Sequence, residues 1–273
     1  MTDYLTDDWP SAPPMTALVN RVLHTDALSL LAMLPSASVD AFITDLPYGT
    51  TACSWDEIIP FAPMWAAVKR TLKPRGVFVT TASQPFTSKL VMSNVSMFKY
   101  EWIWHKTRPF DIYNCKNKPL KIHENIVVFS ESDVANGSIN RMDYYPQGLI
   151  KTDKHWKRPR KYGSNHNVDR PSHSLDRIIE FENYPRTVIE FANPNNDSLH
   201  PTEKPLDLYE YLILTYTQPN ALVVDFCCGS GTTALAARNL DRRFIVGDIT
   251  PEYVAIARNR LAQPFTPRLP FAS

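Results

Sequence analysis

The sequence predicts an α/β fold built around a mostly parallel sheet, and three observations support this. Apolar runs typical of buried strands alternate with stretches of helical periodicity. Two of these runs end in polar loops, Asp45 to Tyr48 and Asp225 to Thr233. Residues 131–185, in contrast, show no clear periodicity. Ligands of open α/β sheets bind outside the carboxyl ends of the strands, so we expect both loops to face one crevice.

The first part of the chain contains an arm followed by a strand and helix pattern. Residues 1–20 are rich in proline and are expected to be loosely structured. Beyond Asp26 we predict three helices and four strands. The helices are expected at residues 27–34, 62–72 and 86–97, and the strands at residues 39–44, 77–81, 101–105 and 125–129. The segment Lys106 to Lys121 between the last two strands is polar and basic, and connections of this length are usually functional or disordered.

Regular structure is expected to return after the irregular stretch. We predict a strand at 186–191, a helix at 206–216, a strand at 221–224, a helix at 233–240, a strand at 243–247 and a helix at 252–261. Pro205 suits a first helical turn, where its missing N–H costs little. The pattern therefore divides the chain into one domain, residues 1–130 and 186–273, and an insertion, residues 131–185.

The composition excludes some classes of protein. The net charge of the 273 residues is +1, so any basic surface must be local. The cysteines Cys53, Cys115, Cys227 and Cys228 form no C-x-x-C pair, and we expect them to be reduced and buried, without a metal site. The first 20 residues contain no Lys or Arg, and no apolar run is long enough for a membrane span. We therefore expect a cytoplasmic protein without membrane contact.

The loop from Asp225 to Thr233 has the layout of a cofactor site. A glycine-rich turn joins a strand to a helix, whose first N–H groups can bind a negative group. Asp248 ends the next expected strand, where a carboxylate can bind ribose hydroxyls. Thr232 crowds the place of a pyrophosphate, which favours S-adenosylmethionine, a nucleoside with an amino-acid tail. A tight turn without a ligand is the alternative for the loop taken alone.

The loop Asp45-Leu46-Pro47-Tyr48 has the chemistry of a site for an exocyclic amine. The lone pair of such a nitrogen is delocalised, and two acceptors for its N–H bonds, the Asp45 carboxylate and the Leu46 carbonyl, would favour tetrahedral geometry. Pro47 would stiffen the loop, and Tyr48 could stack on a flipped base. An ordinary turn is the alternative, because Asp and Pro are common turn residues.

Taken together, these motifs resemble the DNA amino-methyltransferases of the permuted group, in which the catalytic motif precedes the cofactor motif. Asp26-Ala27-Leu28, His123 to Phe129, His200 to Pro205 and Gly247-Asp248-Ile249 match further segments of that family. The resemblance covers most of the chain. It implies a three-layer, Rossmann-like methyltransferase fold that uses S-adenosylmethionine and acts on double-stranded DNA.

The resemblance also implies roles for individual residues. Asp45, Leu46, Pro47 and Tyr48 would be catalytic. The cofactor would be bound by Asp26, Ala27, Asp45, His200, Thr202, Lys204, Asp225, Phe226, Cys227, Gly229, Ser230, Gly231, Thr232, Thr233, Asp248 and Ile249. Residues 131–185 would be the target-recognition region, with Lys157, Arg158, Arg160 and Lys161 on DNA phosphates. Lys106 to Lys121 would be either a loop that closes over the base or an ordinary surface loop.

The sequence departs from the family pattern at Leu46, where proline is usual, and at Asp248, which is often Glu. Both changes keep the expected chemistry, because Leu46 acts through its carbonyl and Asp248 keeps its charge. The leading Asp45 is more typical of adenine N6 enzymes than of cytosine N4 enzymes. We therefore expect an adenine-specific DNA methyltransferase. N4-cytosine methylation and a non-catalytic DNA-binding protein are the alternatives. A homodimer and a cognate restriction endonuclease are left open.

Overall fold

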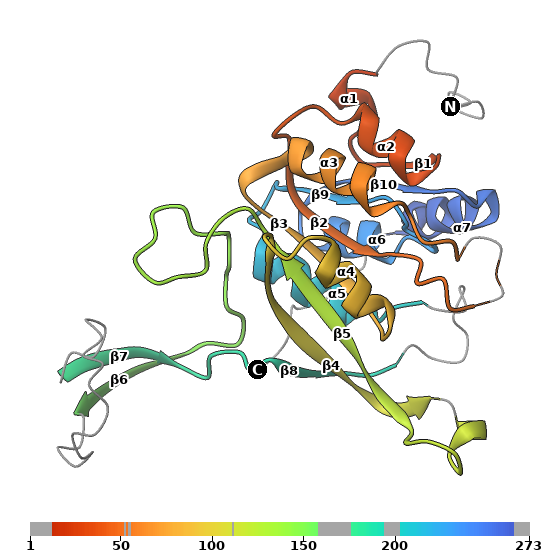
Figure 1. Cartoon of the computed structure of the whole chain (residues 1–273). Helices are drawn as coiled ribbons and strands as arrows, with labels where there is room; N and C mark the ends of the chain where they lie inside the picture. Colours follow the sequence, from red (N-terminus) through yellow and green to blue (C-terminus); the bar gives the residue numbers. More distant parts are fainter. Residues whose placement is uncertain are drawn as a thin grey trace. The chain divides into compact units, whose positions relative to one another are not determined.

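The computed structural model describes residues 13–51, 53, 56–110, 112–157, 176–193 and 203–264 (Figure 1). The chain divides into two compact units. The first comprises Met1–Tyr145 and Thr187–Pro270, and the second comprises Pro146–Arg186 and Phe271–Ser273. No helix within the described ranges has both the length and the apolar character that crossing a membrane requires.

A single eight-stranded sheet forms the centre of the first unit. In spatial order its strands are β1 (Arg21–His24), β10 (Arg243–Asp248), β9 (Leu222–Asp225), β2 (Val39–Asp45), β3 (Leu72–Ala82), β5 (Lys121–Phe129), β4 (Phe98–Phe110) and β8 (Val188–Phe191). In this spatial order, the strands β1, β10, β9, β2 and β3 are parallel to one another. Strand β5 is antiparallel to both of its neighbours, and β8 is parallel to β4. The prediction of a mostly parallel sheet is therefore confirmed.

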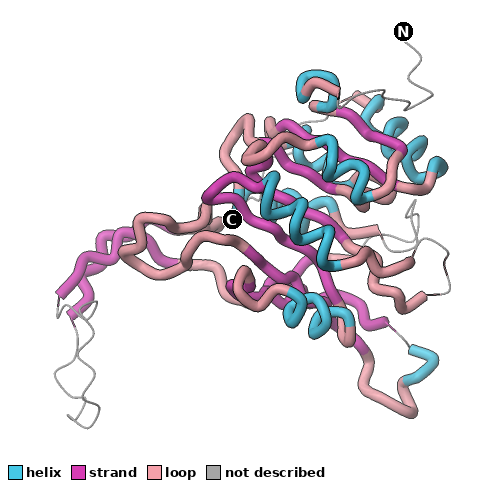
Figure 2. The backbone as a smooth tube through the Cα atoms, turned by 45° about the horizontal axis from the view of Figure 1, so that its top comes forward, coloured by secondary structure: helices cyan, strands magenta, loops and turns pink. Residues whose placement is uncertain are grey.

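Helices cover both faces of this sheet and give the unit three layers (Figures 1 and 2). The helices α1 (Met15–Leu18), α2 (Ala27–Met33), α3 (Phe61–Thr71) and α4 (Phe86–Ser93) cover one face, and α5 (Leu206–Tyr216), α6 (Thr232–Asn239) and α7 (Pro251–Ala262) cover the other. Successive side chains of a strand point to opposite faces. Thus Phe78 of β3 packs with α3, whereas its neighbours Val77 and Val79 belong to the core shared with α5.

Most predicted elements are confirmed within one or two residues, and α5 matches at both ends. Strand β3 begins at Leu72 rather than at residue 77, because the sequence from Lys73 to Gly76 is typical of a helix end, and β4 begins at Phe98 rather than at residue 101. Three further details differ. The four-residue strand β1 and the short helix α1 were not predicted, because neither is long enough to show a period. Helix α4 ends at Ser93 rather than Met97. Cys53 and Cys115 are exposed rather than buried, although all four cysteines are free as expected.

The segment Lys106 to Lys121 is more regular than the sequence indicates. Strand β4 continues to Phe110 and β5 begins at Lys121, so the two strands form a long hairpin with a short 3₁₀ turn, Ile112–Asn114, near its tip. The second unit contains another antiparallel pair, β6 (Ile150–Lys157) and β7 (Asp176–Glu182). Polar residues hide any alternation in these strands, which explains why residues 131–185 show no strand pattern.

Candidate active site

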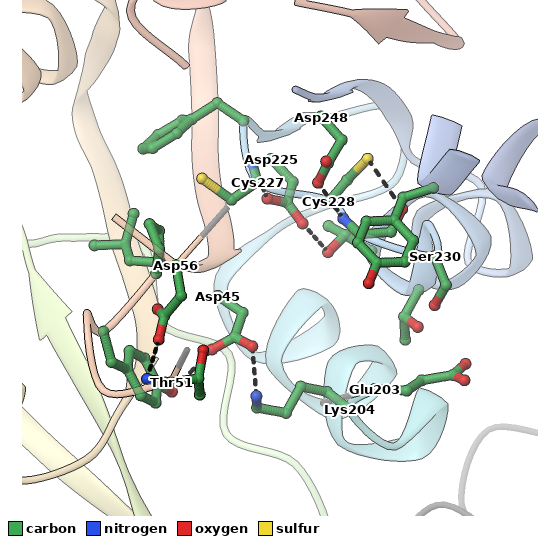
Figure 3. Close-up of a pocket in the computed structure, with 18 of the residues that line it drawn as sticks. Asp45, Thr51, Asp56, Glu203, Lys204, Asp225, Cys227, Cys228, Ser230 and Asp248 are labelled. Atoms are coloured by element: carbon green, nitrogen blue, oxygen red, sulfur yellow. Dashed lines mark hydrogen bonds and ion pairs between the residues drawn. The ribbon is translucent and has the colours of Figure 1, made fainter. Parts of the chain in front are cut away.

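The carboxyl ends of β2, β9 and β10 open into one cavity of about 1190 Å³ (Figure 3). Strands β2 and β9 are neighbours in the sheet, which brings together two loops that are far apart in sequence. The hydroxyl of Thr44, at the end of β2, donates a hydrogen bond of 2.7 Å to Asp225 Oδ1 at the end of β9. The two loops therefore face one crevice, as the strand-end rule predicts.

Almost all of the predicted catalytic and cofactor-binding residues in the described part of the chain line this cavity. They are Asp26, Ala27, Asp45, Leu46, Pro47, Tyr48, Lys204, Asp225, Phe226, Cys227, Gly229, Ser230, Thr232, Thr233, Asp248 and Ile249. His200, Thr202, Arg158, Arg160 and Lys161 lie outside the described residues. Lys157 is the last residue of β6, and its side chain lies outside the described part of the structure.

Gly231 is not among the lining residues and has a different task. It is the N-cap of α6 with φ at 81°, a left-handed conformation that favours glycine. A Cβ atom here would lie 2.6 Å from the Cβ of Ala257 on α7. The second glycine of the loop therefore permits close packing of α6 and α7, in addition to the turn itself.

Asp225 holds the start of the glycine-rich loop by three hydrogen bonds. Its carboxylate accepts from the hydroxyls of Thr44 and Thr233, the latter at 2.5 Å, and from the N–H of Cys227 at 3.0 Å. Burial raises the pKa of Asp225 to about 7, although these three hydrogen bonds act in the opposite direction. The side chain thus joins β2, the loop and α6 at the floor of the cavity.

Asp248 lies at the end of β10 and reaches the same loop. Its Oδ2 accepts from the Gly229 N–H at 2.8 Å, and its Oδ1 accepts from the Thr250 N–H at 2.9 Å. An ionised carboxylate has about four acceptor positions. Asp248 therefore supports the loop and keeps acceptor capacity for hydroxyl groups of a ligand in the cavity.

Arg260 of α7 is a residue that the sequence analysis missed. Its guanidinium donates to the Ser230 carbonyl at 2.8 Å, to Ser230 Oγ at 2.9 Å and to Thr232 Oγ1 at 3.2 Å, and it pairs with Glu203 at 3.0 Å. It thus connects the glycine-rich loop to the segment that precedes α5. The charge at 260 could be seen in the sequence, but the pairing could not.

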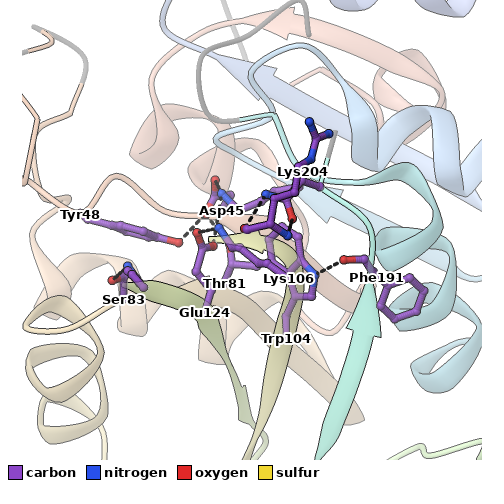
Figure 4. Close-up of polar contacts among 12 residues, drawn as sticks. Asp45, Tyr48, Thr81, Ser83, Trp104, Lys106, Glu124, Phe191 and Lys204 are labelled. Carbon is purple, nitrogen blue, oxygen red and sulfur yellow. Dashed lines mark hydrogen bonds and ion pairs between the residues drawn. The ribbon is translucent and has the colours of Figure 1, made fainter. Parts of the chain in front are cut away.

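Asp45 is the last residue of β2, and its carboxylate is surrounded by donors (Figure 4). Oδ1 accepts from the hydroxyl of Tyr48 at 2.9 Å and from that of Thr81 on β3. Oδ2 accepts from the ammonium of Lys204. Lys204, predicted at the cofactor, thus contacts the catalytic loop directly. Burial alone would lower the pKa of Lys204, but the carboxylates of Asp45 and Glu124 together raise it.

Tyr48 is half-buried and fixed on both sides. Its ring stacks on Phe86 with centroids 5.1 Å apart, and the Lys204 ammonium lies 5.9 Å from the ring centroid. Burial and the nearby carboxylates of Asp45 and Glu124 raise the pKa of Tyr48 well above its ordinary value, so it stays a hydroxyl donor.

Asp56 fixes the turn that follows Tyr48. It accepts three backbone N–H bonds, from Gly49 and Thr50 at 2.9 Å and from Thr51 at 2.7 Å. Figure 3 shows Asp56 beside Thr51. Burial would raise the pKa of Asp56, but the hydrogen bonds from Thr51, Gly49 and Thr50 outweigh it and lower the pKa. The turn that carries Tyr48 is therefore held in place by a carboxylate that the sequence analysis did not identify.

Glu124 and Lys106 were also missed, and they extend the charges around Asp45. Glu124 of β5 accepts from Lys106 of β4 at 2.5 Å, and its Oε2 lies 3.8 Å from Lys204 Nζ. The one signal in the sequence was Glu124 itself, a charged residue at the start of the apolar run 125–129. Among the residues that the structure describes, no group of three or more His, Cys, Asp or Glu could hold a metal ion.

The fold and the two adjoining loops define an α/β methyltransferase domain, and comparison with known proteins gives the family. The DNA methylase model for N6 and N4 methyltransferases matches residues 39–259. The chain therefore belongs to the N6-adenine/N4-cytosine DNA methyltransferase family.

Characterised relatives and solved structures agree with this family. The chain is 27% identical over 258 residues to the Type II methyltransferase M.HpaI of Haemophilus parainfluenzae, covering 90% of this chain and 75% of that protein. It is 28% identical to M1.MboII of Moraxella bovis, covering 86% and 94%. The fold resembles that of the cytosine-N4-specific PvuII DNA methyltransferase, with a TM-score of 0.60, 18% identity and coverage of 89% and 86%. The M1.HpyAVI–SAM complex gives a TM-score of 0.57 at 23% identity, covering 89% and 99%.

Proposed function

We propose that this chain transfers a methyl group from S-adenosylmethionine to the N6 amine of a flipped adenine in DNA. The observation that carries the proposal is the position of Asp45. Its carboxylate lies at the carboxyl end of β2 and accepts hydrogen bonds from Tyr48, Thr81 and Lys204. The preceding residue, Thr44, donates to Asp225 at the start of the glycine-rich loop. The catalytic loop precedes the cofactor loop in the chain, which supports membership of the permuted group.

The residues of the glycine-rich half suit S-adenosylmethionine. Gly231, the N-cap of α6, has no side chain that could cap the helix, so the N–H groups of the first turn can bind a carboxylate such as that of a methionine tail. Asp248 has acceptor capacity for ribose hydroxyls, and Asp26 lines the same cavity. When bound, S-adenosylmethionine supplies an electrophilic methyl group on a sulfonium.

The residues of the catalytic half suit a planar amine. Three donors already bind the Asp45 carboxylate, which leaves about one acceptor position for an N–H of the target. The Leu46 carbonyl is the proposed second acceptor. Two acceptors would orient the nitrogen so that its lone pair could form the new bond to the methyl carbon as the bond from that carbon to sulfur breaks and leaves its electron pair on sulfur, and positioning of this kind supplies much of the acceleration. The proton that the nitrogen then releases can pass to Asp45.

DNA contact is proposed for two segments. The tip of the β4–β5 hairpin exposes Tyr113 completely, together with Ile112, Lys116 and Lys118, and Arg108 and Lys121 of the same hairpin line the cavity. Cations there can bind phosphates, and an aromatic side chain can stack on a base. The insertion 131–185, with Lys157, Arg158, Arg160 and Lys161, stays the predicted recognition region. The homodimer, the restriction endonuclease and the cytoplasmic location also stay predictions.

Nucleoside mass spectrometry of unmethylated DNA incubated with the protein and S-adenosylmethionine tests the proposal. N6-methyladenine with the wild type, and none with Asp45→Ala, is the expected result. N4-methylcytosine would keep the mechanism and correct the base. If no methylated base forms although cofactor binding is measured by calorimetry, the protein is a DNA binder or acts on RNA or protein, and the proposal is wrong.

A further inference from the structure

Four charged side chains gather beside the catalytic loop, and together they are neutral. The carboxylates are those of Asp45 and Glu124, and the ammonium groups are those of Lys106 and Lys204 (Figure 4). Their side chains are 22%, 12%, 6% and 8% exposed, respectively. They come from β2, β5, β4 and the segment before α5, so the fold brings them together from four places in the sequence. Charges are rarely buried in this way unless they are paired.

Each of the two carboxylates has one close ammonium partner. Lys204 donates to Asp45, whereas its Nζ is 3.8 Å from Glu124 Oε2. Glu124 Oε1 accepts from Lys106 at 2.5 Å. In the described part of the chain, Glu124 Oε2 is buried and has no hydrogen-bond partner. A buried acceptor without a hydrogen-bond partner is unfavourable. Glu124 Oε2 is therefore available as a second hydrogen-bond acceptor for the Lys204 ammonium.

The distance that separates the two positions is short. A shift of the ammonium by about 1 Å toward Glu124 would reach ordinary hydrogen-bond distance. No proton moves, so the group of four stays neutral. Burial would raise the pKa of Glu124, but Lys204, Lys106 and Lys121 together outweigh it and lower the pKa, which keeps this residue charged as an acceptor.

We propose that Glu124 is a positioning residue that receives the Lys204 ammonium when the target amine enters, so that Asp45 Oδ2 no longer shares its charge with this ammonium when it accepts an N–H of that amine. This inference rests on the proposed function, because it needs an amine at Asp45. It does not depend on whether the amine belongs to adenine or to cytosine.

Glu124→Gln tests the proposal, because the amide keeps the shape and an acceptor for Lys106 but loses the charge. The assay follows methyl transfer to DNA under conditions in which the wild type is first shown to be active, so failure of the proposed function is recognised separately. We expect kcat/KM to fall about 10–100-fold, as for other losses of positioning, with unchanged affinity for S-adenosylmethionine. Glu124→Asp, which keeps the charge, should retain more activity than Glu124→Gln. The exposed Glu190→Gln on β8 is the matched control and should behave as the wild type.

A double variant separates this role from simple charge balance. Glu124→Gln combined with Lys106→Met makes the group neutral again but provides no second carboxylate for Lys204. The proposal predicts that the double variant stays as slow as Glu124→Gln. Recovery of activity in the double variant, or wild-type kcat/KM in Glu124→Gln, would overturn it. If Glu124→Gln does not fold, as judged by urea unfolding, Lys106→Met takes its place as the test. This variant leaves the Glu124 carboxylate available to Lys204, so a loss of kcat/KM as large as that expected of Glu124→Gln would overturn the proposal.

Discussion

The carboxylates of Asp45 and Asp225 end neighbouring strands of the sheet, yet they are held by different kinds of partner. Asp225 is 2% exposed and accepts from two hydroxyls and one backbone N–H, with no cation among these partners. Asp45 also accepts from two hydroxyls, but its third donor is the ammonium of Lys204. One carboxylate is a buried structural link, and the other is part of a charged group that faces the cavity.

This difference indicates that the two halves of the crevice have different roles, one in binding the cofactor and the other in catalysis. The glycine-rich half is built from backbone groups and short side chains close together in sequence, and it is suited to hold a cofactor in a fixed shape. The catalytic half depends on side chains from distant segments, and hydrogen bonds to charged groups are the stronger ones. Changes in the first half should act on binding and stability, and changes in the second half should act on turnover.

Asp45→Asn should show the largest effect and is the strongest test of this separation. The amide keeps the size of the side chain but loses the charge that pairs with Lys204 and one of its acceptor oxygens. We expect kcat to fall about 10²–10⁴-fold, the range for loss of a positioned proton acceptor, while affinity for S-adenosylmethionine is unchanged. Rapid-quench turnover and calorimetry measure the two quantities. Equal loss of both would show that the two halves are not separable.

Asp225→Asn should change stability in a pH-dependent way. In the folded state the pKa of Asp225 is raised to about 7 from an ordinary value of 3.8, so the folded chain keeps this proton after the unfolded chain has lost it. Stability therefore falls as pH rises from about 4 to about 7 and this contribution is constant above that. The asparagine variant lacks the effect. Urea unfolding at several pH values should show the stability of the wild type decreasing relative to the variant by up to about 4 kcal/mol across this window.

The same urea unfolding series for Asp45→Asn tests whether Asp45 and Asp225 differ as described above. If both variants gave the same pH dependence of unfolding, the two carboxylates would be equivalent buried acids. The expected result is that Asp225→Asn loses the pH dependence of the wild type, whereas a reference variant such as Asp133→Asn, which lies outside the cavity, keeps it.

The same contrast explains what could be predicted from the sequence. The glycine-rich loop and Asp248 were found because strand, turn and helix follow one another within a short segment. Asp45 was found because it ends an apolar run. Glu124, Lys106 and Arg260 were missed because their partners are remote in sequence, as Arg260 and Ser230 are, and only the fold brings them together. The hairpin tip was read as irregular because charged and aromatic residues there face outward and leave no periodic apolar face.

Arg260→Met should give the smallest effect and shows where the first half also depends on a distant side chain. The guanidinium holds Ser230 and Thr232 of the glycine-rich loop and pairs with Glu203, so its loss should loosen the loop without changing Asp45. We expect affinity for S-adenosylmethionine to fall about tenfold, or ~1.4 kcal/mol, with kcat at saturation nearly unchanged. Arg258→Met is the matched control, because Arg258 lies on the same helix but donates to the Val22 carbonyl of β1. If calorimetry gave the same loss of affinity for both variants, the cause would be the stability of α7, and the interpretation of Arg260 as a support of the loop would be wrong.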